Sequence, residues 1–275
     1  MEQLLWLIPL GFGVGTLGTL IGAGGGFILV PVLLLLYPDK SPETITSISL
    51  AVVFFNAVSG TSAYAKMKRI DYKSGLIFAA AGIPGSLIGA MTTSRLPRQW
   101  FDLCFGVLMV AVSTFLALRT IREKQNGNKA AEHRAGGFLR KITDADGIEY
   151  LFSYNLPTGI IISVFVGFLS SMMGIGGGII HVPAMINLLN FPVHIATATS
   201  HFMLIIMSFT GSIVHVFDGV LLKGLLQIFG LALGVIFGAR LGARLSRKVK
   251  GSFIVLGLAC ALGMVGLRLI LTALW

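Results

Sequence analysis

Residues 174–183 read GIGGGIIHVP and residues 22–31 read GAGGGFILVP, both inside long apolar segments. Each stretch contains three consecutive glycines, and a proline stands five residues after the last of them. Glycine lets the backbone turn sharply, because it adopts conformations that a side chain disfavours. We therefore expect each segment to turn at its glycines, as a helix hairpin or a re-entrant pair.

The composition indicates an integral membrane protein. Of the 275 residues, 55% are hydrophobic and 12% are charged, and the mean hydropathy is +0.88. Soluble globular chains carry more charge and fewer apolar residues. The apolar runs do not alternate at period two, as the strands of a membrane barrel would, so we expect an all-α polytopic membrane protein. The expected location is a cell membrane, namely the plasma or inner membrane of a bacterium.

The apolar runs fall into two sets of four, with a polar segment between them. The first set comprises residues 4–37, 44–64, 75–93 and 100–118, and the second comprises residues 157–189, 195–216, 224–243 and 252–275. The organisation that we expect is a first membrane repeat at residues 1–121, a solvated cytoplasmic linker at residues 122–155 and a second membrane repeat at residues 156–275.

The two sets match residue by residue. The glycines at residues 24–26 and the proline at residue 31 match those at residues 176–178 and 183. The other matches are Thr46 with Thr197, Ser49 with Ser200, Gly60 with Gly211, Gly85 with Gly234 and Gly89 with Gly238. The chain is therefore an internal tandem repeat. Glycines that recur every four residues, as from Gly230 to Gly242, predict close packing of helix backbones.

Lysine and arginine gather in three loops, which we expect on the cytoplasmic side of the membrane. These loops lie at residues 66–73, 119–141 and 240–250. With that orientation, the run at residues 4–37 begins and ends outside, and the run at residues 157–189 begins and ends inside. The two halves would then be inverted relative to each other, with both ends of the chain outside.

Inverted repeats with interrupted helices are typical of secondary transporters, which bind their substrates near the middle of the membrane. The N–H groups at the start of a helix lack partners within it, and an anion satisfies them with the help of the helix dipole. A dinucleotide-binding glycine loop is disfavoured, because no strand-helix unit with polar surroundings flanks the glycines. A packing role for the glycines, without a ligand, stays open.

The placement of charges and hydroxyls favours an anionic substrate. Every acidic residue, including Asp71, Asp102 and Asp218, lies in a loop or near the end of a run. Carriers of protons, sodium or other cations usually place a carboxylate in the membrane core, whereas hydroxyls can donate to an oxyanion. The predicted substrate-binding residues are the turn glycines, the hydroxyls that follow them and two histidines: Gly24, Gly25, Gly26, Thr46, Ser47, Ser49, Gly176, Gly177, Gly178, His181, Thr197, Thr199, Ser200 and His201.

Several of these polar residues also have simpler interpretations. A helical hydroxyl often bonds to a carbonyl of the preceding turn, and a buried histidine is often a neutral core residue. Asn56 would either bond across helices or meet the substrate. His194 and His215 are expected near the membrane surfaces. No metal site is expected, because no carboxylate or thiol completes a ligand set around the histidines.

Other functions find little support in the sequence. No nucleophile has an adjacent base, so we expect neither an enzyme nor a cofactor. The net charge of +10 comes mostly from the basic loops and predicts contact with anionic membrane lipid, not with nucleic acid. Cys104 and Cys260 lie in apolar runs, where we expect them to be buried by packing. The sequence leaves open whether the chain forms a homo-oligomer.

The motifs GAGGGFILVP and GIGGGIIHVP, with TSISL from residue 46 and TATSHF from residue 197, resemble the sulfite exporter TauE/SafE family, also called the 4-toluene sulfonate uptake permease family. The resemblance covers nearly the whole chain except residues 122–150. It implies a secondary transporter of small sulfur-containing anions, such as sulfite, sulfoacetate or related organosulfonates. One departure is His181, because the first half has Leu29 and Val30 beside its proline. An uncoupled anion channel and a transporter of a non-sulfur organic anion are the alternatives.

Overall fold

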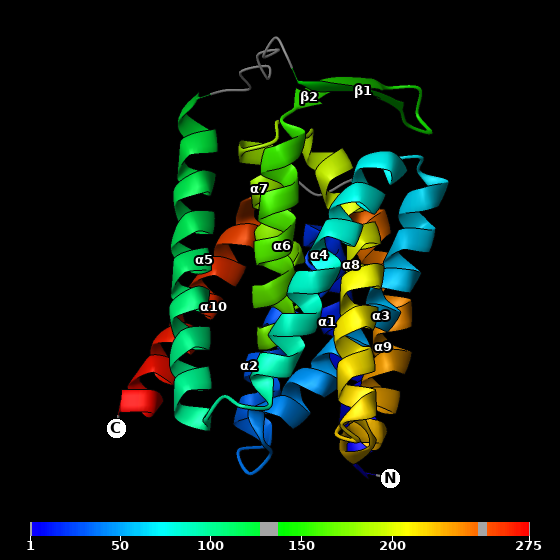
Figure 1. Cartoon of the computed structure of the whole chain (residues 1–275). Helices are drawn as coiled ribbons and strands as arrows, with labels where there is room; N and C mark the ends of the chain where they lie inside the picture. The colour runs from blue at the N-terminus through cyan, green and yellow to red at the C-terminus, as the bar shows by residue number, and fades with distance from the viewer. Residues whose placement is uncertain (1, 127–136, 247–251, 275) are drawn as a thin grey trace. The chain divides into compact units, whose positions relative to one another are not determined.

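The computed structural model describes residues 2–126, 137–246 and 252–274 (Figure 1). The first half contains α1 (Glu2–Ile21), α2 (Gly26–Leu36), α3 (Pro42–Lys66), α4 (Tyr72–Thr93) and α5 (Arg98–Asn126). The second half contains α6 (Leu156–Met173), α7 (Gly178–Asn187), α8 (Val193–Phe217), the short 3₁₀ helix η1 (Leu221–Gly224), α9 (Leu225–Leu245) and α10 (Ser252–Leu274). Each half is therefore a broken helix pair followed by three longer helices, and each predicted apolar run contains one helix or one broken pair.

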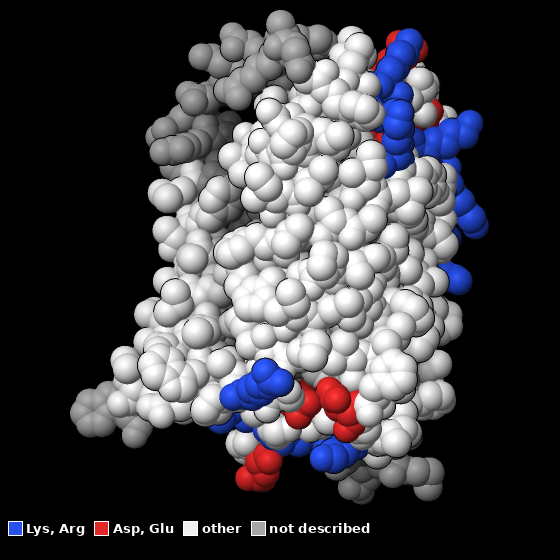
Figure 2. All heavy atoms as spheres, viewed as in Figure 1, with Lys and Arg blue, Asp and Glu red and all other residues white. Residues whose placement is uncertain are grey.

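Several of the described helices have the length and composition of membrane spans. Five of them, namely α3, α4, α6, α8 and α9 together with η1, are long and apolar enough to cross a membrane. On the face that Figure 2 shows, charged side chains gather near the two ends and along one edge, and the broad middle carries none. The chain is a multi-pass membrane protein, as predicted. Cys104 and Cys260 are exposed, so the expectation that they are buried is wrong; an apolar lipid surrounding accepts thiols without burial.

The chain forms two compact units, and each draws on both halves. One unit contains Met1–Ser94 with His133–Arg247, and the other contains Arg95–Glu132 with Lys248–Trp275. Within the first unit, α1 packs against α9 and α6 packs against α4; within the second, α5 packs against α10. The repeats predicted from the sequence follow chain order, whereas the compact units combine helices from both repeats.

Glycines allow the helix pairs of the first unit to approach closely, as predicted. A Cβ added at Gly85 of α4 would collide with the carbonyl oxygen of Val164 on α6. One added at Gly234 of α9 would collide with the carbonyl oxygen of Ile8 on α1. Backbone contact of this kind is a common role of glycine between membrane helices.

The predicted solvated linker contains a β-hairpin, so the loop prediction is wrong for the described part of the linker. β1 (Phe138–Thr143) pairs antiparallel with β2 (Glu149–Tyr154). Residues 127–136 of the predicted linker lie outside the described residues. Burial alternates along the strand FLRKIT, but its residue types do not alternate between apolar and polar, so the sequence carries no clear period-two signal for it.

Aromatic side chains anchor the hairpin on the helices. Phe152 and Tyr154 of β2 are buried in one cluster with Phe78 of α4 and with Phe191, which precedes α8. The ring centroids of Phe152 and Phe191 lie 4.5 Å apart, and those of Phe78 and Tyr154 lie 5.5 Å apart. Aromatic pairs at such distances contribute about 0.5–1.5 kcal/mol each beyond the area that they bury. The hairpin therefore belongs to the packed core of the first unit.

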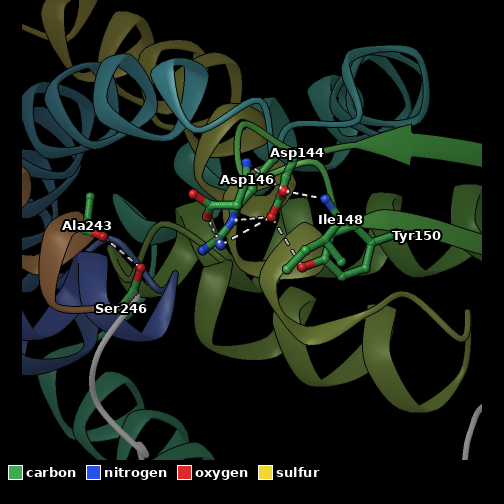
Figure 3. Close-up of polar contacts among 7 residues, drawn as sticks. Asp144, Asp146, Ile148, Tyr150, Ala243 and Ser246 are labelled. Carbon is green, nitrogen blue, oxygen red and sulfur yellow. Dashed lines mark hydrogen bonds and ion pairs between the residues drawn. The ribbon is translucent and has the colours of Figure 1, made fainter.

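A buried ion pair holds the turn of the hairpin. Arg69, which follows α3, donates from Nε and Nη2 to Asp144 Oδ2, both at 3.3 Å. Backbone N–H groups of Asp146 and Ile148 donate to the other carboxylate oxygen, at 2.9 and 3.0 Å (Figure 3). Burial by itself raises the pKa of Asp144, but these hydrogen bonds and the guanidinium outweigh it, so its pKa lies below the ordinary value. The turn is therefore tied to the end of α3 by a charged aspartate.

Candidate substrate site

Both glycine turns use backbone conformations that favour glycine. Between α1 and α2, φ is 81° at Gly22, 77° at Gly24 and 84° at Gly25. Between α6 and α7, φ is 72° at Gly174, 80° at Gly176 and 86° at Gly177. Residues with side chains rarely adopt these angles, so the breaks predicted at the glycines are confirmed. We call Gly22–Gly25 the first tip and Gly174–Gly177 the second tip.

The two tips contact each other through their backbones. A Cβ added at Gly26, the first residue of α2, would lie 2.7 Å from the carbonyl oxygen of Gly174. One added at Gly178, the first residue of α7, would collide with the carbonyl oxygen of Gly22. Only glycine allows so close an approach. In this conformation the tips therefore fill the space between them.

The helices that start at the tips have uncapped N-termini. Gly25 and Gly177 occupy the N-cap positions of α2 and α7, and neither helix has a side-chain cap. In the described part of the chain, the N–H groups of residues 26–27 and 178–179 donate no hydrogen bond. Free N–H groups and the helix dipole together attract anions. The tips thus have the donor chemistry that an anion requires.

Four of the predicted hydroxyl residues lie at the tips, and each tip is contacted by the helix from the other half. Ser49 Oγ donates to the carbonyl oxygen of Gly174 at 2.6 Å. Its counterpart Ser200 donates to the carbonyl oxygen of Gly22 at 3.4 Å. Thr46 and Thr197 are the nearest neighbours of the same two glycines. Matching residues therefore make matching contacts across the two halves.

Several predicted site residues, including Thr197 beside the first tip, have their polar groups engaged elsewhere. Ser47 and Thr197 each donate to a carbonyl of the preceding turn of their own helix, at 2.8 Å. Thr199 Oγ1 accepts from the N–H of Asp71, at 2.9 Å. His181 Nε2 lies 3.3 Å from Ser163 Oγ, inside the α6–α7 pair. These hydroxyls and this imidazole do not point to the contact between the tips.

A buried polar network at the first tip includes three residues that the sequence analysis did not place in the site. Thr19 Oγ1 lies 3.2 Å from Asn56 Oδ1 and 3.3 Å from His201 Nε2. Asn56 Nδ2 donates to the carbonyl oxygen of Gly24 at 2.9 Å. Of the two interpretations offered for Asn56, this contact supports the bond across helices. Tyr64 donates to the carbonyl oxygen of Thr19 at 2.7 Å. A signal in the sequence exists for Asn56 alone, because its counterpart in the second half is the apolar Met207.

Three buried hydroxyls near the second tip have no partner. Thr46 Oγ1, Ser170 Oγ and Ser171 Oγ form no hydrogen bond with any described residue. Thr46 contacts Gly174, and Ser170 Oγ would lie 3.0 Å from a Cβ added at Gly177. Buried polar groups are almost always satisfied, by the chain, by water or by a ligand. These hydroxyls are therefore donors that a bound group can use.

A basic pocket lies at the ends of α3 and α9. Its volume is about 240 Å³, and it is lined by Ser62, Ala63, Lys66, Met67, Ala145, Arg240 and Arg244. Among the described residues, none of its three cationic side chains forms an ion pair. Unpaired cations around a concave surface raise the local concentration of anions.

Comparison with known proteins gives consistent matches along the chain. The family model described as Sulfite exporter TauE/SafE matches residues 7–269. A probable membrane transporter protein of Bacillus subtilis, YunE, is 39% identical over 270 residues, which cover 96% of this chain and 96% of the relative. A probable membrane transporter protein of Methanocaldococcus jannaschii is 26% identical over 288 residues, which cover 98% of this chain and 97% of the relative. No solved structure matches the chain.

Proposed function

The chain belongs to the sulfite exporter TauE/SafE family of membrane transporters, and we propose that it is a secondary transporter of small sulfur-containing anions. Sulfite, sulfoacetate and related organosulfonates are the substrates in question. The anion would bind near the middle of the membrane, between the two tips. The names of the family and of the relatives describe transporters and not enzymes.

The observation that carries this proposal is the excess of hydrogen-bond donors at the tips. The N–H groups that start α2 and α7 have no partner among the described residues, nor do the hydroxyls of Thr46, Ser170 and Ser171. Carboxylates stand at helix ends, with Glu43 in the first turn of α3 and Asp71 at the N-cap of α4. A carboxylate beside these donors would repel an anion, so a site with donors and no nearby carboxylate suits an oxyanion. Each hydrogen bond from a donor to such a charged acceptor contributes about 1.5–3 kcal/mol.

Transport would require the tips to separate. Because they fill the space between them here, this conformation would correspond to a closed state. Rocking of α1 with α9 against α4 with α6 would open the tips toward each side of the membrane in turn. Transporters built from inverted repeats commonly work by such alternating access. In support of inversion, the N-terminus leads into α1 at one end of the bundle, and β2 leads into α6 at the opposite end (Figure 1).

The basic pocket supports the same substrate class. Lys66, Arg240 and Arg244 belong to basic segments that we expect to face the cytoplasm. A positive concave surface there would draw small anions from the cytoplasm toward the carrier. The steering would weaken as the ionic strength rises, since exposed charges are screened over about 10 Å at 0.1 M salt.

Uptake by proteoliposomes that contain the purified chain tests the proposal. We expect the uptake of sulfite or sulfoacetate to saturate with concentration, and acetate to compete poorly. Gly177→Leu should abolish uptake, because it places a side chain at a φ of 86° beside Ser170. The matched control is Gly147→Leu, since Gly147 also has a positive φ, of 81°, but a side chain there meets open space.

Three outcomes would contradict the proposal in different ways. Flux that does not saturate and follows the membrane voltage would indicate an uncoupled anion channel. Equal uptake of sulfonates and of simple carboxylates would indicate a carrier of organic anions in general. Full activity of Gly177→Leu, equal to that of Gly147→Leu, would reduce the tip glycines to a packing role.

A further inference from the structure

His215, near the end of α8, is a buried histidine without a hydrogen-bond partner. Its relative exposure is 0%, and neither Nδ1 nor Nε2 forms a hydrogen bond with a described residue. It stands near the end of α8, but it is packed inside the protein and not exposed there. Leaving a buried donor or acceptor unsatisfied costs about 1–3 kcal/mol, so the imidazole needs a partner that the described chain does not supply.

Two carboxylates stand beside this imidazole. Glu43 Oε1, in the first turn of α3, lies 4.0 Å from His215 Nδ1. Asp218 is the C-cap residue of α8, and one ligand atom from each of the three residues lies within 4.8 Å of the other two. Glu43 is remote from His215 along the chain, so the sequence alone did not predict that this carboxylate and that of Asp218 meet the imidazole.

The charges of this cluster favour a cation between its members. Glu43 and Asp218 carry like charges at close range, and a cation removes their repulsion. Asp218 also stands at the C-terminal end of α8, where the helix dipole attracts positive charge. Lys223 is a competing cation, since its charge acts on Glu43.

We propose that Glu43, His215 and Asp218 bind a divalent transition-metal ion of the zinc type. One imidazole nitrogen and two carboxylate oxygens form a donor set that zinc accepts, whereas magnesium and calcium prefer oxygen alone. Zinc requires ligand distances of about 2.0–2.2 Å, so the donor atoms must move together. Glu43 and Asp218 are not fully buried, and rotation of their side chains supplies this movement. Water would occupy the fourth position.

The site would join the two halves of the chain. Glu43 belongs to α3 of the first half, and His215 and Asp218 belong to α8 and its end in the second half. Both helices contact the tips, through Ser49 and Ser200. A metal ion that links α3 to α8 would therefore resist any relative movement of these helices, stabilise the fold and slow transport.

Zinc binding to the purified full-length chain tests the site independently of transport. We expect zinc chloride to raise the midpoint of thermal unfolding by several degrees, magnesium chloride to have no effect, and a chelator to reverse the shift. His215→Ala should weaken zinc binding, measured by calorimetry, at least about tenfold, since loss of even a residue behind the ligands typically has that effect. His194→Ala is the control, because His194 lies at the opposite end of α8.

Glu43→Gln and Asp218→Asn keep the shape of the site, and they replace His215→Ala as test variants if that variant does not fold. Each should also weaken zinc binding at least about tenfold while the protein without metal keeps its thermal stability. An unchanged zinc affinity in these variants would overturn the proposal, and so would zinc binding that His194→Ala weakens as strongly as His215→Ala. Equal stabilisation by magnesium would overturn the assignment to a transition metal.

Discussion

The first tip satisfies most of its own polar groups, whereas the second tip leaves several open. At the first tip, the N–H groups of Ala23 and Gly24 donate to the carbonyl oxygen of Gly18, at 2.8 and 3.2 Å. The carbonyl oxygen of Gly24 accepts from Asn56 at 2.9 Å. The turn is thus held from both sides by hydrogen bonds.

The second tip has fewer such bonds at the matching positions. The N–H of Ile175 donates to the carbonyl oxygen of Ser170 at 3.1 Å, but that of Gly176 donates to no described residue. Met207 stands where the first half has Asn56, so no side-chain amide reaches this turn. Ser170 and Ser171 keep free hydroxyls beside it. We infer that the first tip is the anchored one and that the second tip offers its donors to the substrate.

The largest effect is expected from Gly18→Ser, which gives the first half the serine that stands at the matching position, Ser170, in the second half. Gly18→Ser places a Cβ against the backbone nitrogen and Cα of Gly25, which cannot move without opening the turn. We expect a loss of stability of about 3 kcal/mol or failure to fold, because overpacking of this kind is destabilising. The yield of monodisperse protein and the midpoint of thermal unfolding are the measurements.

The reverse exchange at the second tip is the matched control. Ser170→Gly removes a hydroxyl that has no partner, so we expect a loss below about 1 kcal/mol, mostly from the lower helix propensity of glycine. Equal effects of Gly18→Ser and Ser170→Gly would show that the two turns are equivalent and would remove the basis of the comparison.

The glycine motifs were sufficient to predict where the helices break. A positive φ demands glycine whatever surrounds it, so the motif carries the backbone information by itself. The direction of the hydroxyls was not predictable in this way. Ser47 and Ser49 are neighbours on one helix, yet Ser47 bonds within α3 and Ser49 reaches the second tip. Which of them meets the tip depends on the packing of α6 against α3, which a single helix sequence does not contain.

The polar network of the first tip was not predictable from the residues that match between the two halves. Asn56 and His201 stand where the other half has Met207 and Leu50. Neither residue therefore belongs to a matching pair, and the repeat does not predict that the two side chains lie close together. Their contacts with Thr19 and Gly24 arise from helices distant in sequence. Differences between repeats are therefore as informative as matches when one site is built from two halves.

A medium effect is expected from removing one hydroxyl at each tip. Thr19→Val takes away the hydroxyl that contacts Asn56 Oδ1 and His201 Nε2, both buried, so we expect a loss of stability of about 1–3 kcal/mol. Ser171→Ala removes a hydroxyl that has no partner and should leave stability unchanged within about 0.5 kcal/mol. If that hydroxyl serves the anion, Ser171→Ala should still weaken substrate binding about tenfold.

Thermal unfolding and substrate binding by calorimetry separate these two effects. The comparison predicts that Thr19→Val changes mainly stability and that Ser171→Ala changes mainly binding. A variant Ser171→Ala that is destabilised as much as Thr19→Val would mean that the hydroxyl of Ser171 has a structural partner, and the second tip would then be as closed as the first.

The smallest effects concern Thr46 and Thr197, which match in the two halves but differ in their hydrogen bonds. Thr46 Oγ1 has no partner among the described residues, whereas Thr197 Oγ1 donates to the carbonyl oxygen of Val193. Valine keeps the shape and the β-branch of threonine, so the two substitutions differ only in the hydroxyl that they remove. Thr46→Val should weaken sulfite or sulfonate binding about tenfold, the value of one bond to a charged acceptor. Thr197→Val should weaken it less than about twofold, because that hydroxyl is already engaged within its helix. Binding that falls equally in both variants would mean that the substrate draws Thr197 away from its helix and uses the two tips alike.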